Sequence, residues 1–227
     1  MTRRYSAASL MREGLRGQTG WELAWRNAEL KSRYDAVVIG GGGHGLATAY
    51  YLKRNHGLAN VAVIERGWIG GGNTGRNTTV IRSNYFYPET ANFFDFSLRL
   101  YETMSRDLNY NIMFSQRGMI TLGHDRHGME LLRRSANAML LNGVDAELLT
   151  GDEVRVRIPG LNRSPRFPVL GGLNQPRGGT ARHDAVAWAY ARAASALGVD
   201  IIQNCEVQDF LMKGGRVCAL ETSCSAT

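Results

Sequence analysis

The sequence has few prolines and cysteines, and it has no long apolar run. No run approaches the roughly 20 apolar residues that a membrane-spanning helix requires, so we expect no membrane segment. Its three cysteines, Cys205, Cys218 and Cys224, lack the spacing of metal ligands, and their odd number argues against a disulfide framework. The sequence therefore predicts a cytoplasmic protein with no metal site and no disulfide framework.

Nucleic-acid binding is not expected either, although the formal net charge is +7. Residues 1–33 contain seven basic and three acidic side chains, a net charge of +4, which leaves only +3 for the remainder. A basic tail on a nearly neutral body, without a nucleic-acid-binding motif, is a weak indication of such binding. The glutamates in this segment also argue against a transit peptide. We expect residues 1–29 to form a basic arm or surface helix that packs on a partner subunit.

Glycine, by contrast, is abundant, with 27 residues against 5 prolines, which suits a nucleotide-binding fold with tight turns. The run 34–39 predicts a buried parallel strand, 46–54 a helix that ends at Gly57, and 61–65 a second buried strand. Strand, glycine loop, helix and strand together form a βαβ unit.

Further along the chain the pattern alternates between helices and strands. It predicts helices at 89–107 and 127–141, a strand at 118–122, and mainly loop over 151–180, with a strand near 167–173. Asp184 is expected to cap a helix over 185–197, followed by a parallel strand at 199–202. Gly214 and Gly215 predict the turn of a hairpin between 207–213 and 216–222.

These elements indicate an α/β fold built around a dinucleotide-binding domain. We expect a Rossmann-like dinucleotide-binding domain from residues 30–85 and 180–227, after the arm at 1–29. Residues 86–179 would supply part of a second, substrate-binding α+β domain.

The segment between the first two strands carries the pattern Gly-x-Gly-x-x-Gly at Gly40, Gly42 and Gly45. Such a pattern alone occurs by chance, but here it follows a strand, opens a helix, and precedes Glu65 at the end of the next strand. Gly40 permits the tight turn, Gly42 lets the backbone approach a pyrophosphate, and Gly45 lets helix and strand pack closely. Glu65 would accept hydrogen bonds from the adenosine ribose. His44 is expected to contact or cap the phosphates, with catalysis the less favoured alternative.

A second glycine- and hydroxyl-rich loop at 70–79 favours FAD over NAD as the dinucleotide. An NAD-binding domain would normally continue into another βα unit, whereas a long loop beside the ribose acid suits a ligand that carries a flavin ring. The competing interpretation is a flexible surface loop.

The chain resembles the beta subunits of heterotetrameric bacterial sarcosine oxidases from about residue 20 onward. The wider relatives are glycine, D-amino-acid and dimethylglycine oxidoreductases. The segments that carry the resemblance are 40–51, 60–67, 70–79, 81–85, 114–118, 179–188 and 198–207.

The resemblance implies roles for individual residues. Val207 matches a backbone contact on the adenine side of noncovalent FAD, and His183 matches a histidine that carries covalent FMN where this subunit meets the alpha subunit. Arg82 matches, in monomeric relatives, an arginine that binds the substrate carboxylate. From the residues alone, His183 could merely be a surface residue in the first turn of a helix, and Arg82 could equally be a structural arginine. The other positions that match the FAD site are Gly43, His44, Glu65, Asn73, Thr74, Thr78 and Val80.

The reaction implied is the oxidation of sarcosine to glycine, with hydrogen peroxide as a product and the one-carbon unit passed to tetrahydrofolate. The partners implied are the alpha, gamma and delta subunits. Alternatives are another FAD-dependent amine or amino-acid oxidase or dehydrogenase, and a non-catalytic dinucleotide-binding fragment. Family members continue beyond residue 222, and the polar tail 223–227 departs from their pattern, so we expect a truncated or partial sequence.

Overall fold

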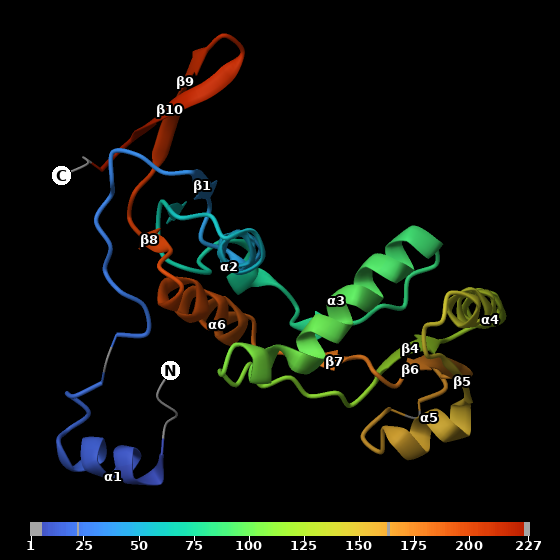
Figure 1. The fold of residues 1–227 in the computed structure, drawn as a ribbon. Helices are drawn as coiled ribbons and strands as arrows, with labels where there is room; N and C mark the ends of the chain where they lie inside the picture. Colours follow the sequence, from blue (N-terminus) through green and yellow to red (C-terminus); the bar gives the residue numbers. More distant parts are fainter. Residues whose placement is uncertain (1–5, 22, 163, 225–227) are drawn as a thin grey trace. The chain divides into compact units, whose positions relative to one another are not determined.

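The computed structural model describes residues 6–21, 23–162 and 164–224, and these divide into two compact units (Figure 1). The first unit contains the described parts of Met1–Thr78, Ser105–Ile112 and His183–Thr227. The second contains the described parts of Thr79–Met104 and Met113–Arg182. Each unit is therefore assembled from stretches that are not continuous in the sequence. The domain bounds at 85/86 and 179/180 stay a prediction.

A three-stranded parallel sheet, in the order β1-β2-β8, forms the centre of the first unit. Its strands are β1 (Ala36–Ile39), β2 (Val61–Ile64) and β8 (Asp200–Ile202). All four residues of the middle strand β2 are buried, as expected for an apolar strand covered on both faces. The parallel strands predicted at 34–39, 61–65 and 199–202 are confirmed, and so is the α/β class.

Helices α2 (Gly43–His56) and α6 (His183–Ala196) pack against each other in this unit. The ring of Tyr190 lies 5.8 Å from that of Tyr50 and 6.1 Å from that of Tyr51, between centroids. Helix α2 ends as predicted at Gly57, whose φ of 63° is left-handed and therefore suits glycine.

The start of α6 differs from the prediction. The helix begins at His183, so Asp184 lies inside its first turn and is not the N-cap. The Asp184 carboxylate still accepts a hydrogen bond from the Ala185 N–H, at 2.8 Å. A short acidic side chain can accept a hydrogen bond from a free N–H group at the helix N-terminus whether it lies in the first turn or at the N-cap. The sequence pattern does not distinguish these two positions.

Part of the basic N-terminal charge is paired within the unit. The arm contains helix α1 (Ala7–Leu15), and further along it Arg26 donates to the Gly198 carbonyl at 2.9 Å and pairs with the buried Asp200. Lys31 reaches the same carboxylate at 2.7 Å. A buried carboxylate needs such compensation, so Arg26 in the arm and Lys31 just after it fix this segment beside β8.

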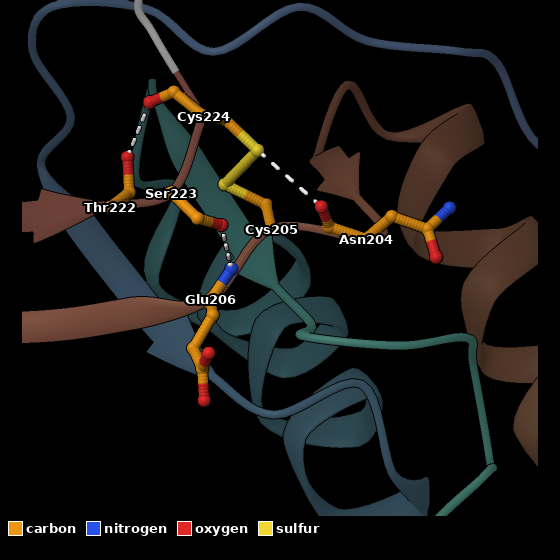
Figure 2. Close-up of a disulfide and its surroundings, with 6 residues drawn as sticks. All are labelled: Asn204, Cys205, Glu206, Thr222, Ser223 and Cys224. Carbon is orange, nitrogen blue, oxygen red and sulfur yellow. Dashed lines mark hydrogen bonds between the residues drawn. A yellow bond between two sulfur atoms is a disulfide. The ribbon is translucent and has the colours of Figure 1, made fainter.

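The predicted hairpin is confirmed, and it closes with an unpredicted disulfide. Strands β9 (Val207–Lys213) and β10 (Arg216–Thr222) pair antiparallel around Gly214 and Gly215, which have φ values of 58° and 76°. Beyond the ladder, Cys205 and Cys224 form a disulfide (Figure 2). The odd cysteine count argued against a disulfide framework, and for this one pair that argument is wrong. The number of cysteines in a sequence does not show which of them lie close together, and here the pairing of the two hairpin strands brings Cys205 and Cys224 together.

The second unit is built on an antiparallel sheet in the order β4-β6-β5. Its middle strand β6 (Gly171–Gln175) is buried throughout, and α4 (Arg126–Leu141) packs on the sheet. The strand at 118–122 and the helices at 89–107 and 127–141 are confirmed. The remaining elements are β3 (Val80–Ile81), α3 (Pro88–Asp107), β4 (Met119–Gly123), β5 (Glu147–Thr150), α5 (Gly151–Arg157) and β7 (Gly179–Thr180).

The prediction of loop over 151–180 is wrong in part, since helix α5 occupies its start. Thr150 and Glu153 form a capping box, in which the Thr150 hydroxyl accepts from the Glu153 N–H and the Glu153 carboxylate accepts from the Thr150 N–H. This Thr-x-x-Glu pattern was visible in the sequence. The strand expected near 167–173 lies at 171–175.

A cluster of charges holds the turn after β6. Arg177 pairs with Asp95 at 3.0 Å and Glu102 at 2.9 Å, while its N–H donates to Asp145 at 2.7 Å. The hydrogen bond from Arg177 holds the pKa of Glu102 below its usual value. These contacts tie α3 to the end of β6 within the second unit.

The contact between β1 and α2 in the first unit tolerates no side chain at Gly45. A Cβ there would lie 2.0 Å from the Gly40 carbonyl oxygen and 3.3 Å from Val38 Cγ1. We therefore expect Gly45→Ala to destabilise the protein by about 1–3 kcal/mol, because overpacking outweighs the gain in helix propensity. The measurement is the midpoint of thermal unfolding.

Gly14→Ala is the matched control, since Gly14 also lies in a helix of the same unit. Its Cβ would meet only the Gln18 side chain, at an ordinary 3.7 Å. This variant should leave the midpoint unchanged or raise it slightly. Equal behaviour of the two variants would contradict the packing argument.

Candidate cofactor-binding site

The glycine loop predicted to bind a dinucleotide joins β1 to α2 in the first unit. Gly40 has a φ of 108°, which a residue with a side chain rarely adopts, and its N–H donates to the Ile64 carbonyl at 2.8 Å. Gly42 is the N-cap of α2. The loop therefore turns sharply at the end of β1 and delivers the chain into the helix.

Glu65 joins this loop to the next one. Its carboxylate accepts from the Gly41 N–H at 2.7 Å and from the Gly67 N–H at 2.9 Å. Its own N–H donates to the Ile202 carbonyl at 2.8 Å. Each carboxylate oxygen can accept two hydrogen bonds and accepts one of these, so Glu65 retains capacity for a ligand hydroxyl.

Thr74 connects the second glycine-rich loop to the start of α2. Its hydroxyl accepts from the Gly43 N–H at 2.9 Å, and a Cβ at Gly42 would lie 3.1 Å from the same oxygen. Thr74 belongs to a short 3-10 helix, η1 (Asn73–Arg76). The predicted loop at 70–79 thus has a defined turn at its centre and closes over the helix N-terminus.

These loops surround a cavity of about 520 Å³ at the N-terminus of α2. The first N–H groups of a helix have no partner within it and carry partial positive charge, so this end favours an anion such as a pyrophosphate. The structure brings together here eight of the predicted FAD residues, namely Gly40, Gly42, Gly43, His44, Gly45, Glu65, Asn73 and Thr74.

The cavity lining also includes large side chains that the sequence analysis did not name individually. Arg66 and Arg76 add positive charge, and Trp68 presents an aromatic ring that is 68% exposed. Each lies next to a predicted motif, so position relative to Glu65 and to the second loop was the signal that could have identified them.

A smaller cavity of about 270 Å³ adjoins the first through Gly40 and Glu65. Val207, predicted to contact the adenine side, lines it together with Cys205. The residues available for an adenosine group therefore come from the ends of β1 and β2 and from the start of β9.

Not every predicted site residue lines these cavities. Thr78 is exposed at the end of the second loop, and Val80 lies in β3, paired with Thr180 in the second unit. Arg82 also belongs to the second unit. It donates to the Asn84 side chain at 2.6 Å, and its guanidinium lies 4.6 Å from the centre of the Tyr85 ring.

His183, the first residue of α6, lies in the first unit and is half-buried. Its Nδ1 atom is buried and has no hydrogen-bond partner within the described part of the chain. A buried imidazole nitrogen usually has one, so a purely structural role leaves this atom unexplained.

The chain is similar to known proteins along nearly its whole length. It is 53% identical to the sarcosine oxidase subunit beta of Rhodobacter capsulatus, over 97% of this chain and 54% of that one. Its identity to the same subunit of Rhizobium meliloti is also 53%, over 97% of this chain and 53% of the other. The chain thus spans about half the length of these curated relatives.

Solved structures show the same fold. L-proline dehydrogenase from P. horikoshii matches with a TM-score of 0.79 and 27% identity, over 86% of this chain and 50% of that one. Glycine oxidase from Bacillus cereus matches with a TM-score of 0.73 and 23% identity, over 84% of this chain and 52% of the other, and supports the fold alone.

The family described as "FAD dependent oxidoreductase" matches residues 35–227, which include both glycine loops, Glu65 and the hairpin. This chain is a member of that FAD-dependent oxidoreductase family.

Proposed function

We propose that this chain is the FAD-binding portion of a sarcosine oxidase beta subunit. The observation that carries the proposal is the 53% identity to two such subunits along 97% of the chain. Relatives of other names, such as the L-2-hydroxyglutarate dehydrogenase of Escherichia coli at 29% identity over 77% of the chain, are much less similar.

The geometry of the glycine loops supports noncovalent FAD as the cofactor. The N-terminus of α2, with Arg66 and Arg76 nearby, suits the pyrophosphate. Glu65 would hold the ribose, and Val207 would border the adenine in the smaller cavity. Bound FAD would supply a two-electron acceptor for the amine, while the protein supplies orientation and charge.

Sarcosine would be oxidised to glycine, with hydrogen peroxide formed and the one-carbon unit transferred to tetrahydrofolate. The relatives are named as one subunit of an enzyme, which supports a multi-subunit assembly. We propose alpha, gamma and delta subunits as partners, and the cytoplasm as the location. None of the helices in the described residues combines the length and apolar character of a membrane span.

The substrate is tested by purifying the native assembly with this subunit as bait. We expect kcat/KM for peroxide formation to be at least about tenfold higher with sarcosine than with glycine, dimethylglycine, L-proline or a D-amino acid. The ratio of kcat/KM values measures how strongly an enzyme discriminates between substrates. A different preferred amine would support the alternative of another amine or amino-acid oxidase on this fold. Tight FAD binding without turnover of any amine would indicate the non-catalytic fragment.

Arg82 is the residue proposed to bind the substrate carboxylate. In the second unit its guanidinium is fixed between Asn84 and the Tyr85 ring, and Tyr85 stacks on Phe94 at 4.0 Å between centroids. A guanidinium with a fixed plane suits bidentate binding of a carboxylate, which lysine cannot reproduce.

Arg82→Lys should therefore raise the KM for sarcosine by about tenfold or more and leave the flavin content intact, because a charge-assisted bidentate contact contributes a few kcal/mol. Steady-state kinetics of the assembly, with flavin absorbance as the control, make the measurement. An unchanged KM would return Arg82 to a structural role.

His183 is the residue proposed to carry covalent FMN beside the alpha subunit. Its half-buried ring and its unpartnered Nδ1 support this role. Attachment to the 8α-methyl position of a flavin requires an imidazole nitrogen that is available for a new bond, and Nδ1 of His183 makes no hydrogen bond within the described residues.

His183→Ala should keep the noncovalent FAD and lose the flavin that survives denaturation. Mass spectrometry of peptides from the denatured subunit decides between the two states. The matched control is His56→Ala at the end of α2, which should keep both flavins. An unmodified peptide containing His183, from fully active enzyme, would contradict the assignment.

A further inference from the structure

Cys205 lies at the junction between the sheet and the proposed adenosine cavity. It lies three residues after the end of β8, is fully buried, and packs with Ile64 and Ile202. Its N–H donates to the Glu65 carbonyl at 3.0 Å, and the preceding N–H of Asn204 donates to the Gly67 carbonyl at 2.8 Å. The backbone of Cys205 therefore forms one wall of the site that Glu65 organises.

Cys224 is brought to Cys205 by the hairpin. Beyond the β9–β10 ladder, the Ser223 N–H donates to the Glu206 carbonyl at 2.8 Å. The Glu206 N–H donates in return to the Ser223 hydroxyl, also at 2.8 Å (Figure 2). The next residues outward on the two strands are the cysteines, whose Cα atoms lie 5.5 Å apart. This separation is within the usual range for a disulfide.

The two cysteines differ in accessibility. Cys205 is fully buried, whereas Cys224 is half-buried and lines a separate cavity of about 890 Å³ between residues 30–37 and the hairpin. A small reagent can therefore reach the pair from the side of Cys224. Cys218, also on this cavity, is exposed and free.

We propose that Cys205 and Cys224 form a redox-responsive pair that controls FAD binding through the adenosine cavity. The proposal rests on the proposed role of this site in binding FAD. The disulfide encloses the whole hairpin, and most side chains of β9 and β10 are exposed. A two-stranded hairpin with little burial is marginally stable, so the bond fixes the position of Val207 at the start of β9. Reduction would loosen that wall of the cavity.

The oxidant in this proposal is hydrogen peroxide. The Cys224 thiolate attacks one peroxide oxygen, so that a sulfur–oxygen bond forms, the oxygen–oxygen bond breaks, and the first water leaves after protonation. The Cys205 thiol then attacks the Cys224 sulfur, which forms the disulfide and releases the second water. Two thiols lose two electrons and two protons to the peroxide. A dithiol reductant reverses the reaction by exchange.

The test compares FAD binding by oxidised and reduced protein. Alkylation and mass spectrometry should count one free thiol, that of Cys218, after peroxide and three after dithiothreitol. FAD titration should give a dissociation constant about tenfold higher for the reduced form, since the cavity wall must then be ordered on binding. Without FAD, limited proteolysis should cut residues 207–222 faster in the reduced protein.

Two variants control the experiment. Cys224→Ser should bind FAD like the reduced form under all conditions, and Cys218→Ser should keep the full response. Equal and tight FAD binding in both redox states, or three free thiols after peroxide, would overturn the switch. Absence of FAD binding in both states, with hairpin proteolysis still redox-dependent, would overturn the proposed FAD site and leave a purely structural disulfide.

Discussion

The carboxylate of Glu65 holds together the two loops that form the candidate site. It accepts a hydrogen bond from the Gly41 N–H in the glycine loop, at 2.7 Å, and one from the Gly67 N–H just before the second loop, at 2.9 Å. Its main chain is bonded on both sides to the segment that leaves β8, through Ile202 and Cys205. One residue thus fixes the spacing between the glycine loop, the second loop and the root of the hairpin.

Close backbone approach is the second condition of this site. The turn at Gly40 has a φ of 108°, which residues with side chains rarely adopt, and a Cβ at Gly45 would lie 2.0 Å from the Gly40 carbonyl oxygen. They bring the N-terminus of α2 to the mouth of the cavity, where its partial positive charge is exposed to a ligand. The same lack of side chains makes the main chain available for hydrogen bonding, with Thr74 holding the Gly43 N–H.

The two compact units have separate tasks in the proposed function. The first contains the proposed dinucleotide site, His183 and the disulfide, and the second contains Arg82 on a rigid aromatic support. An amine oxidase needs both a flavin site and a substrate site, which agrees with membership of the FAD-dependent oxidoreductase family. The chain spans about half the length of these curated relatives.

The sequence by itself determined the elements that depend on local patterns. Three local patterns each specified an element: the apolar runs at 34–39 and 61–65, the glycine spacing from Gly40 to Gly45, and the Gly214–Gly215 turn. Each could be recognised because strand-forming apolar runs and residues that adopt positive φ are encoded within a few neighbouring positions. Helix α5 was encoded equally locally, in the capping box of Thr150 and Glu153, but the abundance of Gly, Pro and Arg over 151–180 obscured it.

Only the tertiary structure decided which distant residues meet. The Cys205–Cys224 pair depends on hairpin register, the anchoring of Arg26 and Lys31 on Asp200 depends on how the arm returns to β8, and the place of Trp68 in the cavity depends on two loops closing together. Such contacts join residues far apart in the chain, so no local pattern determines them. They form because burial and hydrogen bonding across the folded unit offset the entropy of closing the chain between them.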